Sequence, residues 1–136
     1  MLQMKKIILF LFSVAFLLCS SNLFGQYLYD KSGTKVGRID NNYVYDKTGS
    51  TLGRFDGNYI YDKSGSSLGR VDGTYIYDKT GNSLGRIDGN YIYDKSGSVL
   101  GRIDGNYLYD KSGAALGRID NVDSQKAILF FFFFFY

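Results

Sequence analysis

The sequence predicts an all-β protein, a twelve-strand antiparallel meander of six 16-residue hairpin repeats, closed into a shallow β-barrel. The first observation is the repeat itself, which runs without a gap over residues 27–122; one copy, 59–74, reads YIYDKSGSSLGRVDGT. The second is that each copy holds two short β-prone runs bounded by tight turns. The third is the short fixed period, because one such unit cannot bury its own apolar face and must pair with its neighbours.

Each element of the copy 59–74 follows from its residues. The run 59–61 is aromatic and β-branched and predicts a strand. Residues 62–65, Asp-Lys-Ser-Gly, predict a three-residue hairpin loop closed by a glycine with positive φ. The run 68–71 predicts the second strand, and Asp72-Gly73 is a strong two-residue hairpin signal. Both connections are tight, so successive strands must be antiparallel.

The two loops predict a β-bulge in every repeat. A three-residue loop pairs Ile60 with Leu68, whereas a two-residue loop pairs Val71 with Thr74, so the faces would exchange at each copy without one extra residue. We place that residue at Gly69, with positive φ. Ile60, Leu68 and Val71 then share an aliphatic face with their equivalents in the other copies.

The opposite face collects the tyrosines and arginines, which form the candidate binding face. Rings can stack there on guanidinium planes while the hydroxyls reach water. This face has two interpretations, cross-strand ladders that stabilise the sheet or a platform for sugar rings or a cell-surface polymer. The candidate residues are Tyr59, Tyr61, Arg70, Tyr75, Tyr77, Arg86, Tyr91, Tyr93 and Arg102.

A twelve-strand sheet with one aliphatic face has to bury that face and protect two edge strands, and closure into a ring does both. A β-solenoid of hairpins and a folded-over open meander are the alternatives. Twelve strands leave more room inside than eight, so the ring must flatten or be plugged. The domain that we expect to form this sheet is residues 26–122.

The two ends of the chain differ from the repeats. Residues 1–25 are expected to be a signal peptide, because two lysines precede the apolar run 7–18, which is too short to span a membrane comfortably. Cleavage after Ser21 and after Gly25 are both compatible with the pattern. The protein would then be exported to the periplasm, the cell surface or the medium of a bacterium. Lipidation at Cys19 is not expected, because Leu18 is larger than a lipoprotein signal prefers.

The tail 123–136 ends in six Phe and one Tyr and lies outside the repeat. It is too short to span a bilayer. It could plug the ring, act as an outer-membrane assembly signal, or be the relic of a homopolymeric codon tract. The sequence alone narrowly favours the relic. Membrane contact is expected only if the signal segment or this tail is retained.

The repeat resembles the short Tyr-Asp-x-x-Gly hairpin of the β-flower family, whose symmetric meanders close into shallow barrels. The matching positions are Tyr61-Asp62, Gly65, Leu68-Gly69 and Val71, with their equivalents over 27–122. The resemblance implies a fold and no activity. Looser likenesses exist to RHS or YD repeats, whose units are longer, and to choline-binding repeats, which use Trp.

Composition excludes most chemistry. The sequence has no His, no Glu and a single Cys, so His-based nucleophile systems and His/Cys metal sites are absent. We expect no enzyme, no cofactor and no metal. The net charge of +3 includes Lys5 and Lys6, and charges otherwise alternate in sign, so no nucleic-acid partner is expected. The sequence therefore indicates a structural or interaction module of the cell envelope, or else a glycan- or small-ligand-binding module that uses the Tyr/Arg face.

Overall fold

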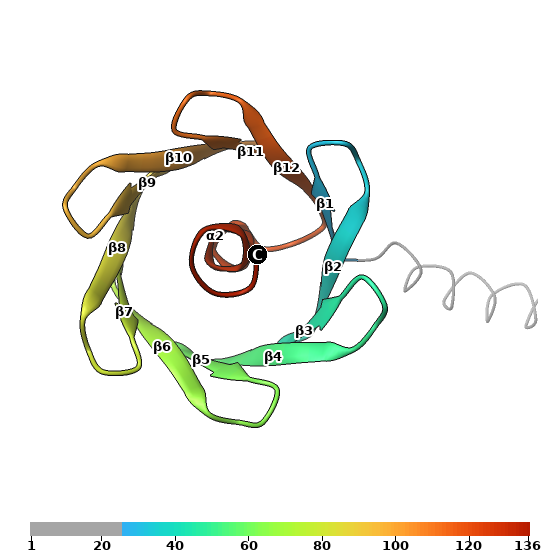
Figure 1. Ribbon diagram of the computed structural model, residues 1–136, viewed down its shortest axis with the longest axis horizontal. Coiled ribbons are helices and arrows are strands. Elements are labelled where there is room, and N and C mark those ends of the chain that lie inside the picture. Colours follow the sequence, from blue (N-terminus) through green and yellow to red (C-terminus); the bar gives the residue numbers. More distant parts are fainter. Residues whose placement is uncertain (1–25) are drawn as a thin grey trace, which may run out of the picture.

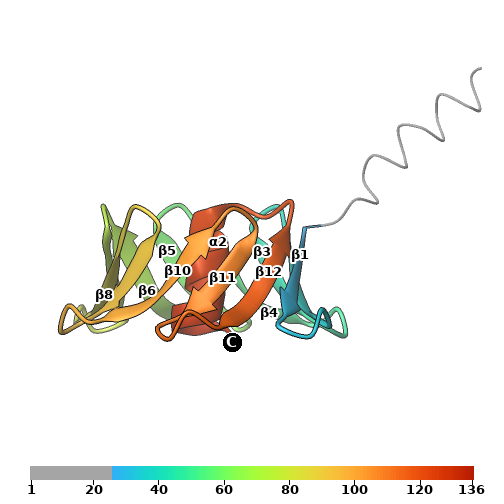
Figure 2. The same ribbon diagram turned by 90° about the horizontal axis from the view of Figure 1, so that it is seen from above.

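The computed structural model describes residues 26–136, so the expected signal peptide, its cleavage site and Cys19 lie outside the described residues. The described chain forms a shallow ring of twelve strands around a central helical segment (Figures 1 and 2). The strands are β1 Tyr27–Asp30, β2 Lys35–Asp40, β3 Tyr43–Asp46, β4 Thr51–Asp56, β5 Tyr59–Asp62, β6 Ser67–Asp72, β7 Tyr75–Asp78, β8 Ser83–Asp88, β9 Tyr91–Asp94, β10 Val99–Asp104, β11 Tyr107–Asp110 and β12 Ala115–Asp120.

The ring is closed by the pairing of its first and last strands. β1 and β12 are antiparallel neighbours, with Leu28 opposite Ile119 and Tyr29 opposite Arg118. Every other neighbouring pair is consecutive in sequence, as expected for a meander. The predicted fold class and closure are confirmed, and the solenoid and the open meander are excluded. Closure leaves no unpaired strand edge in the ring.

The hairpin at 62–66 has the predicted geometry. The N–H of Gly65 donates to the carbonyl of Asp62 at 3.1 Å, and Gly65 has a φ of 87°. The other hairpin lies one residue later than predicted. Asp72 pairs with Tyr75, so the loop residues are Gly73 and Thr74. Only Gly73 has a positive φ, 60°, which is the φ pattern of a type II′ turn.

The predicted bulge exists in every repeat, but its predicted position at Gly69 is wrong. Ile60 pairs with Gly69 and Tyr61 pairs with Ser67, which leaves Leu68 as the extra residue. Gly69 lies in ordinary strand pairing and has no positive φ. The side-chain position of Gly69 faces the inside of the ring, and the residue is buried. The parity argument required one extra residue in each unit, yet it could not decide which of the neighbouring residues bulges out.

The inner face of the ring is aliphatic. Ile60, Val71 and their equivalents other than Ile87 are buried, and the half-buried Leu68 and its equivalents pack against them. The predicted aliphatic face is therefore confirmed, with the leucines at its margin. Ile87 is the exception in its series, because it is only half-buried whereas Ile103 and Val71 are buried.

The tail lies inside the ring. It forms α2 (Ser124–Ile128) followed by the π-helix η1 (Leu129–Phe134), and Ala127 to Phe131 are buried (Figures 1 and 2). This placement is the one that the plug interpretation expects. Among residues 26–136, no helix is both long and apolar enough to cross a membrane.

Candidate functional site

The predicted Tyr/Arg face is the outer wall of the ring. Alternation along β5 turns Ile60 inward, so Tyr59 and Tyr61 point outward. On β6, Gly69 and Val71 are inward and Arg70 is outward between them. Tyr59 is 48% exposed, and its equivalents in four other copies are similar, whereas Tyr61 is half-buried. We call the outward tyrosines and arginines of all six copies the Tyr/Arg wall.

The wall is organised in rows of three residues that cross two adjacent hairpins. Arg70 pairs with Tyr59 on one side and with Tyr77 on the other. Its guanidinium carbon lies 4.3 Å from the centre of the Tyr77 ring, a cation–π contact. The same contact occurs in all six copies, at Arg38–Tyr45, Arg54–Tyr61, Arg70–Tyr77, Arg86–Tyr93, Arg102–Tyr109 and Arg118–Tyr29. The last of these crosses the closing seam of the ring.

An ion pair also holds the guanidinium of four of the six arginines, Arg38, Arg54, Arg70 and Arg102. Nη1 of Arg70 lies 3.6 Å from Oδ2 of Asp72, two residues along the same outward face. The corresponding distance is 3.0 Å between Arg38 and Asp40. Ion pairs this exposed contribute about 0–1 kcal/mol each, so they orient the guanidinium more than they stabilise the fold. The arginine is thus held against one ring with a second, more exposed ring beside it.

The predicted residues are brought together in a different grouping from the sequence repeat. Arg70 stacks on Tyr77 of the following copy and not on Tyr61 of its own copy, whose ring lies under Arg54. The predicted set therefore left out three residues that complete rows on the wall, Tyr43, Arg54 and Tyr109. The repeat itself was the available signal, because every copy carries the same residues at these positions.

The aspartates of the three-residue loops are hydrogen-bond acceptors for their own turns. Oδ1 of Asp62 accepts from the N–H and the Oγ of Ser64, at 2.9 and 2.7 Å, and from the N–H of Ser66 at 3.0 Å. The side-chain hydrogen bond from Ser64 is the largest cause that lowers the pKa of Asp62 below its ordinary value. Within residues 26–136 no three His, Cys, Asp or Glu side chains are grouped so that they could hold a metal ion.

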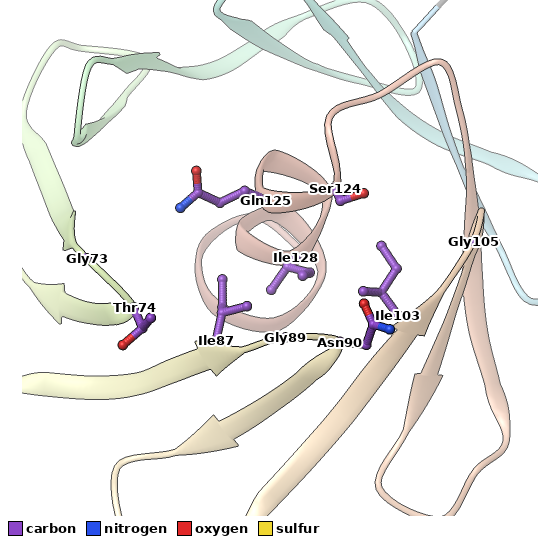
Figure 3. A pocket seen from close by; sticks show the side chains of 10 residues that line it. All are labelled: Gly73, Thr74, Ile87, Gly89, Asn90, Ile103, Gly105, Ser124, Gln125 and Ile128. Atoms are coloured by element: carbon purple, nitrogen blue, oxygen red, sulfur yellow. The ribbon is translucent and has the colours of Figure 1, made fainter.

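A cavity of about 470 Å³ opens at the mouth of the ring, between α2 and the turns that contain Gly73, Gly89 and Gly105 (Figure 3). Ile87, Ile103 and Ile128 give it an apolar floor, and the side chains that accompany them are neutral and polar: Thr74, Asn90, Ser124 and Gln125. Ile87, the half-buried member of its series, borders this cavity. The cavity contains no charged side chain and none of the predicted site residues.

Comparison with known proteins gives one match. The sequence model of a family described as 5-fold beta-flower protein matches residues 25–135. The match covers all six repeats and extends through the phenylalanines of the tail, although its description names five-fold symmetry and this ring has six repeats. No curated protein and no solved structure matches the chain.

Proposed function

The chain belongs to the 5-fold β-flower family, and we propose that it is an exported, non-enzymatic interaction module of the bacterial cell envelope. The β-flower repeat barrel is not a known enzyme family. The observation that carries the proposal is the Tyr/Arg wall, which presents six copies of one Tyr-Arg-Tyr row around the outside of the ring. The tail occupies the interior of the ring. The outer wall therefore offers a macromolecular partner a larger accessible surface than the interior does.

Export is supported by the sequence of residues 1–25. The test is to express the untagged full-length chain in a Gram-negative host, fractionate the cells, and measure the intact mass of the protein. Cleavage after Ser21 would leave Asn22 as the first residue, and cleavage after Gly25 would leave Gln26. Intact, unprocessed protein confined to the cytoplasm would refute export.

Binding by the wall is tested with two matched triple variants of the full chain. Tyr59→Ser, Tyr75→Ser and Tyr91→Ser together remove three exposed rings, while the arginines keep their stacking partners Tyr77, Tyr93 and Tyr109. Lys63→Ser, Lys79→Ser and Lys95→Ser change three exposed turn residues as the control. Partners are captured from solubilised cell envelope. The tyrosine variant should lose the partner that the wild type and the lysine variant retain; equal capture by all three would contradict the proposal.

The second candidate function is a glycan- or small-ligand-binding module on the same wall. It is favoured by one observation, the exposed Tyr59-type ring beside an arginine whose position is fixed by Tyr77 and Asp72. An aromatic face with adjacent donors is suited to the apolar face and hydroxyl groups of a sugar ring. A glycan array probed with the wild type and both triple variants separates the candidates. Glycan binding that only the tyrosine variant loses supports this second function, and an empty array favours a protein partner.

A further inference from the structure

The six phenylalanines 130–135, here called the Phe tract, contact six glycines that point into the ring. We call these the lumen glycines; each comes from a different repeat. A Cβ built on Gly85 would lie 3.1 Å from Cε1 of Phe133, and one built on Gly69 would lie 2.9 Å from Cζ of Phe134. The full set of pairs is Phe130–Gly37, Phe131–Gly117, Phe132–Gly101, Phe133–Gly85, Phe134–Gly69 and Phe135–Gly53. Each ring has one glycine and each glycine one ring.

The order of these pairs is regular. Phe130 contacts the first repeat and Phe131 the sixth, and each later phenylalanine contacts the repeat before that of its predecessor, until Phe135 reaches the second. The tract therefore visits every repeat once, in the opposite direction to the chain of the barrel. An apolar tail packed into the lumen without a specific fit has no reason to distribute its rings in this way.

The backbone of the tract is suited to this distribution. Six equal sites around a ring require a step of about one sixth of a turn per residue, whereas an α-helix advances by about 100° for each residue. The wider π-helix, with its i→i+5 hydrogen bonds, turns less per residue than an α-helix and so comes closer to this step. Phe130 to Phe134 lie in such a helix, η1, and the N–H of Phe135, which follows it, donates to the carbonyl of Phe130 at 3.2 Å.

Glycine is required at the strand positions that the Phe tract contacts. The strand position of Gly69 faces inward beside Ile60, and the buried side chains of this repeat, Ile60 and Val71, are large aliphatic ones. A Cβ there would collide with the backbone carbonyl oxygen of Tyr77 as well as with the ring of Phe134. The missing side chain creates a shallow slot in the wall that a phenyl ring fills.

We infer that the lumen is a binding site for a phenylalanine segment of the same chain, with one slot per repeat, so that the Phe tract and the six repeats form one matched unit. The ligand class is an aromatic peptide segment presented as a π-helix. This inference concerns the interior of the ring and is independent of the function proposed for the outer wall.

The test uses NMR of the isotope-labelled full-length chain. A phenyl ring packed on a glycine displaces the Hα resonances of that glycine through its ring current. Phe133→Leu and Phe130→Leu are conservative changes whose slots, at Gly85 and Gly37, belong to the fourth and first repeats on opposite sides of the ring. We expect Phe133→Leu to move the Hα shifts of Gly85 several-fold more than those of Gly37, and Phe130→Leu to do the reverse.

The turn glycines provide an internal control. Gly65 and Gly81 would have no atom within 4 Å of an added Cβ, so neither substitution should move them. Two outcomes overturn the inference. In the first, both variants displace the same set of glycines, which indicates a plug without slots. In the second, neither variant displaces any lumen glycine, which indicates that the tract does not occupy the ring.

Discussion

Glycine serves two different purposes in each repeat, and they are distinguished residue by residue. Gly65 has a φ of 87° with open space around its Cα, so it is required for backbone conformation. Gly69 has ordinary strand geometry and is required for space. The sequence predicts the first purpose from the turn pattern. For Gly69 the sequence predicts the same purpose, a positive φ, and this prediction is wrong. The close approach of a segment distant in sequence leaves no local signal.

Substitutions at these two glycines should differ accordingly. Gly69→Ala should lower the free energy of unfolding by about 1–3 kcal/mol, the range for overpacking. Gly65→Asn should cost much less, because Asn tolerates positive φ and Asn41 already adopts a φ of 60° in another turn of this chain. Urea denaturation of both variants provides the measurement. A larger loss for Gly65→Asn than for Gly69→Ala would contradict the assignment.

The loop aspartates should make the protein sensitive to acid. Hydrogen bonds from the following Ser or Thr side chain and backbone lower the pKa below the ordinary 3.8 in five loops: Asp46, Asp62, Asp78, Asp94 and Asp110. A lowered pKa in the folded state means that folding favours the charged form. Its stabilising effect is complete above the ordinary pKa and is lost as the pH falls through the lower, folded value.

The urea midpoint of the wild type should therefore fall as the pH is reduced from about 6 to about 2, with most of the loss below the ordinary carboxyl range. A variant with Asn at all five positions should show a flatter profile, since Asn keeps an acceptor oxygen and does not titrate in this range. Parallel profiles for the two proteins would show that other groups control acid stability.

At the scale of the strands, the bulge decides which side chains reach the core. Leu68 is the extra residue of β6. Adjacent residues of a regular strand face opposite sides, but here both Leu68 and its neighbour Gly69 face inward, and Leu68 is half-buried against the inner cluster. Its equivalents Leu84 and Leu100 border the same groove as Phe132 and Phe133. The bulge therefore brings one aliphatic side chain of each repeat, Val36 in the first and a leucine in the other five, against the inner cluster.

Leu68→Asp and Tyr61→Ser test this division between the inner cluster and the outer wall. Leu68→Asp places a charge beside apolar side chains and should cost toward the upper end of the roughly 0.5–3 kcal/mol range for single substitutions. Tyr61→Ser removes one cation–π contact with Arg54, worth about 0.5–1 kcal/mol at an exposed site. Thermal unfolding should rank them in that order, and equal losses would argue against the leucine's role in the core.

The elements show where prediction from sequence ends. The twelve strands, both hairpins and the need for one bulge per unit follow from glycine positions and from parity. The bulge lies one residue from its predicted place, and the predicted Asp72-Gly73 loop lies one residue later. The parity argument gives the number of extra residues in each unit, but it does not give their positions. The rows of the Tyr/Arg wall join neighbouring copies, such as Arg70 with Tyr77, and this grouping requires the register of the paired strands.

At the scale of the whole molecule, closure could be predicted because an open sheet would expose two edges and an aliphatic face. The sequence left the place of the tail open among three alternatives. A run of identical residues has no periodicity that predicts a partner, and its composition is equally that of an accidental tract. One signal was available in the sequence: the tail has six consecutive phenylalanines and the chain has six repeats.

Truncation after Val122 should destabilise the ring strongly. It removes Ile128, Leu129, Phe130 and Phe131, all of which are at most 6% exposed, and it opens the inner face of the barrel to water. Each fully buried large apolar side chain contributes about 1.5–3 kcal/mol, so the loss should reach several kcal/mol. The thermal midpoint and the binding of a hydrophobic dye report it. An unchanged midpoint with improved solubility would instead support the relic interpretation.

The match between the Phe tract and the ring can be tested by changing the number of repeats and the number of phenylalanines together. Deletion of residues 75–90 removes one whole repeat, with its slot at Gly85, and joins Thr74 to Tyr91 through the same turn sequence that it now forms with Tyr75. The shortened ring then has five slots for six phenylalanines, so one ring must be exposed or crowded. Additional deletion of Phe133 restores equal numbers.

We therefore expect the variant that lacks both the repeat and Phe133 to melt at a higher temperature than the variant that lacks the repeat alone, although it has lost one more apolar side chain. Loss of buried apolar surface by itself gives the opposite order, because removing a phenylalanine can then only destabilise. The sign of this one difference in thermal midpoint separates a matched tract from a plug that only fills space.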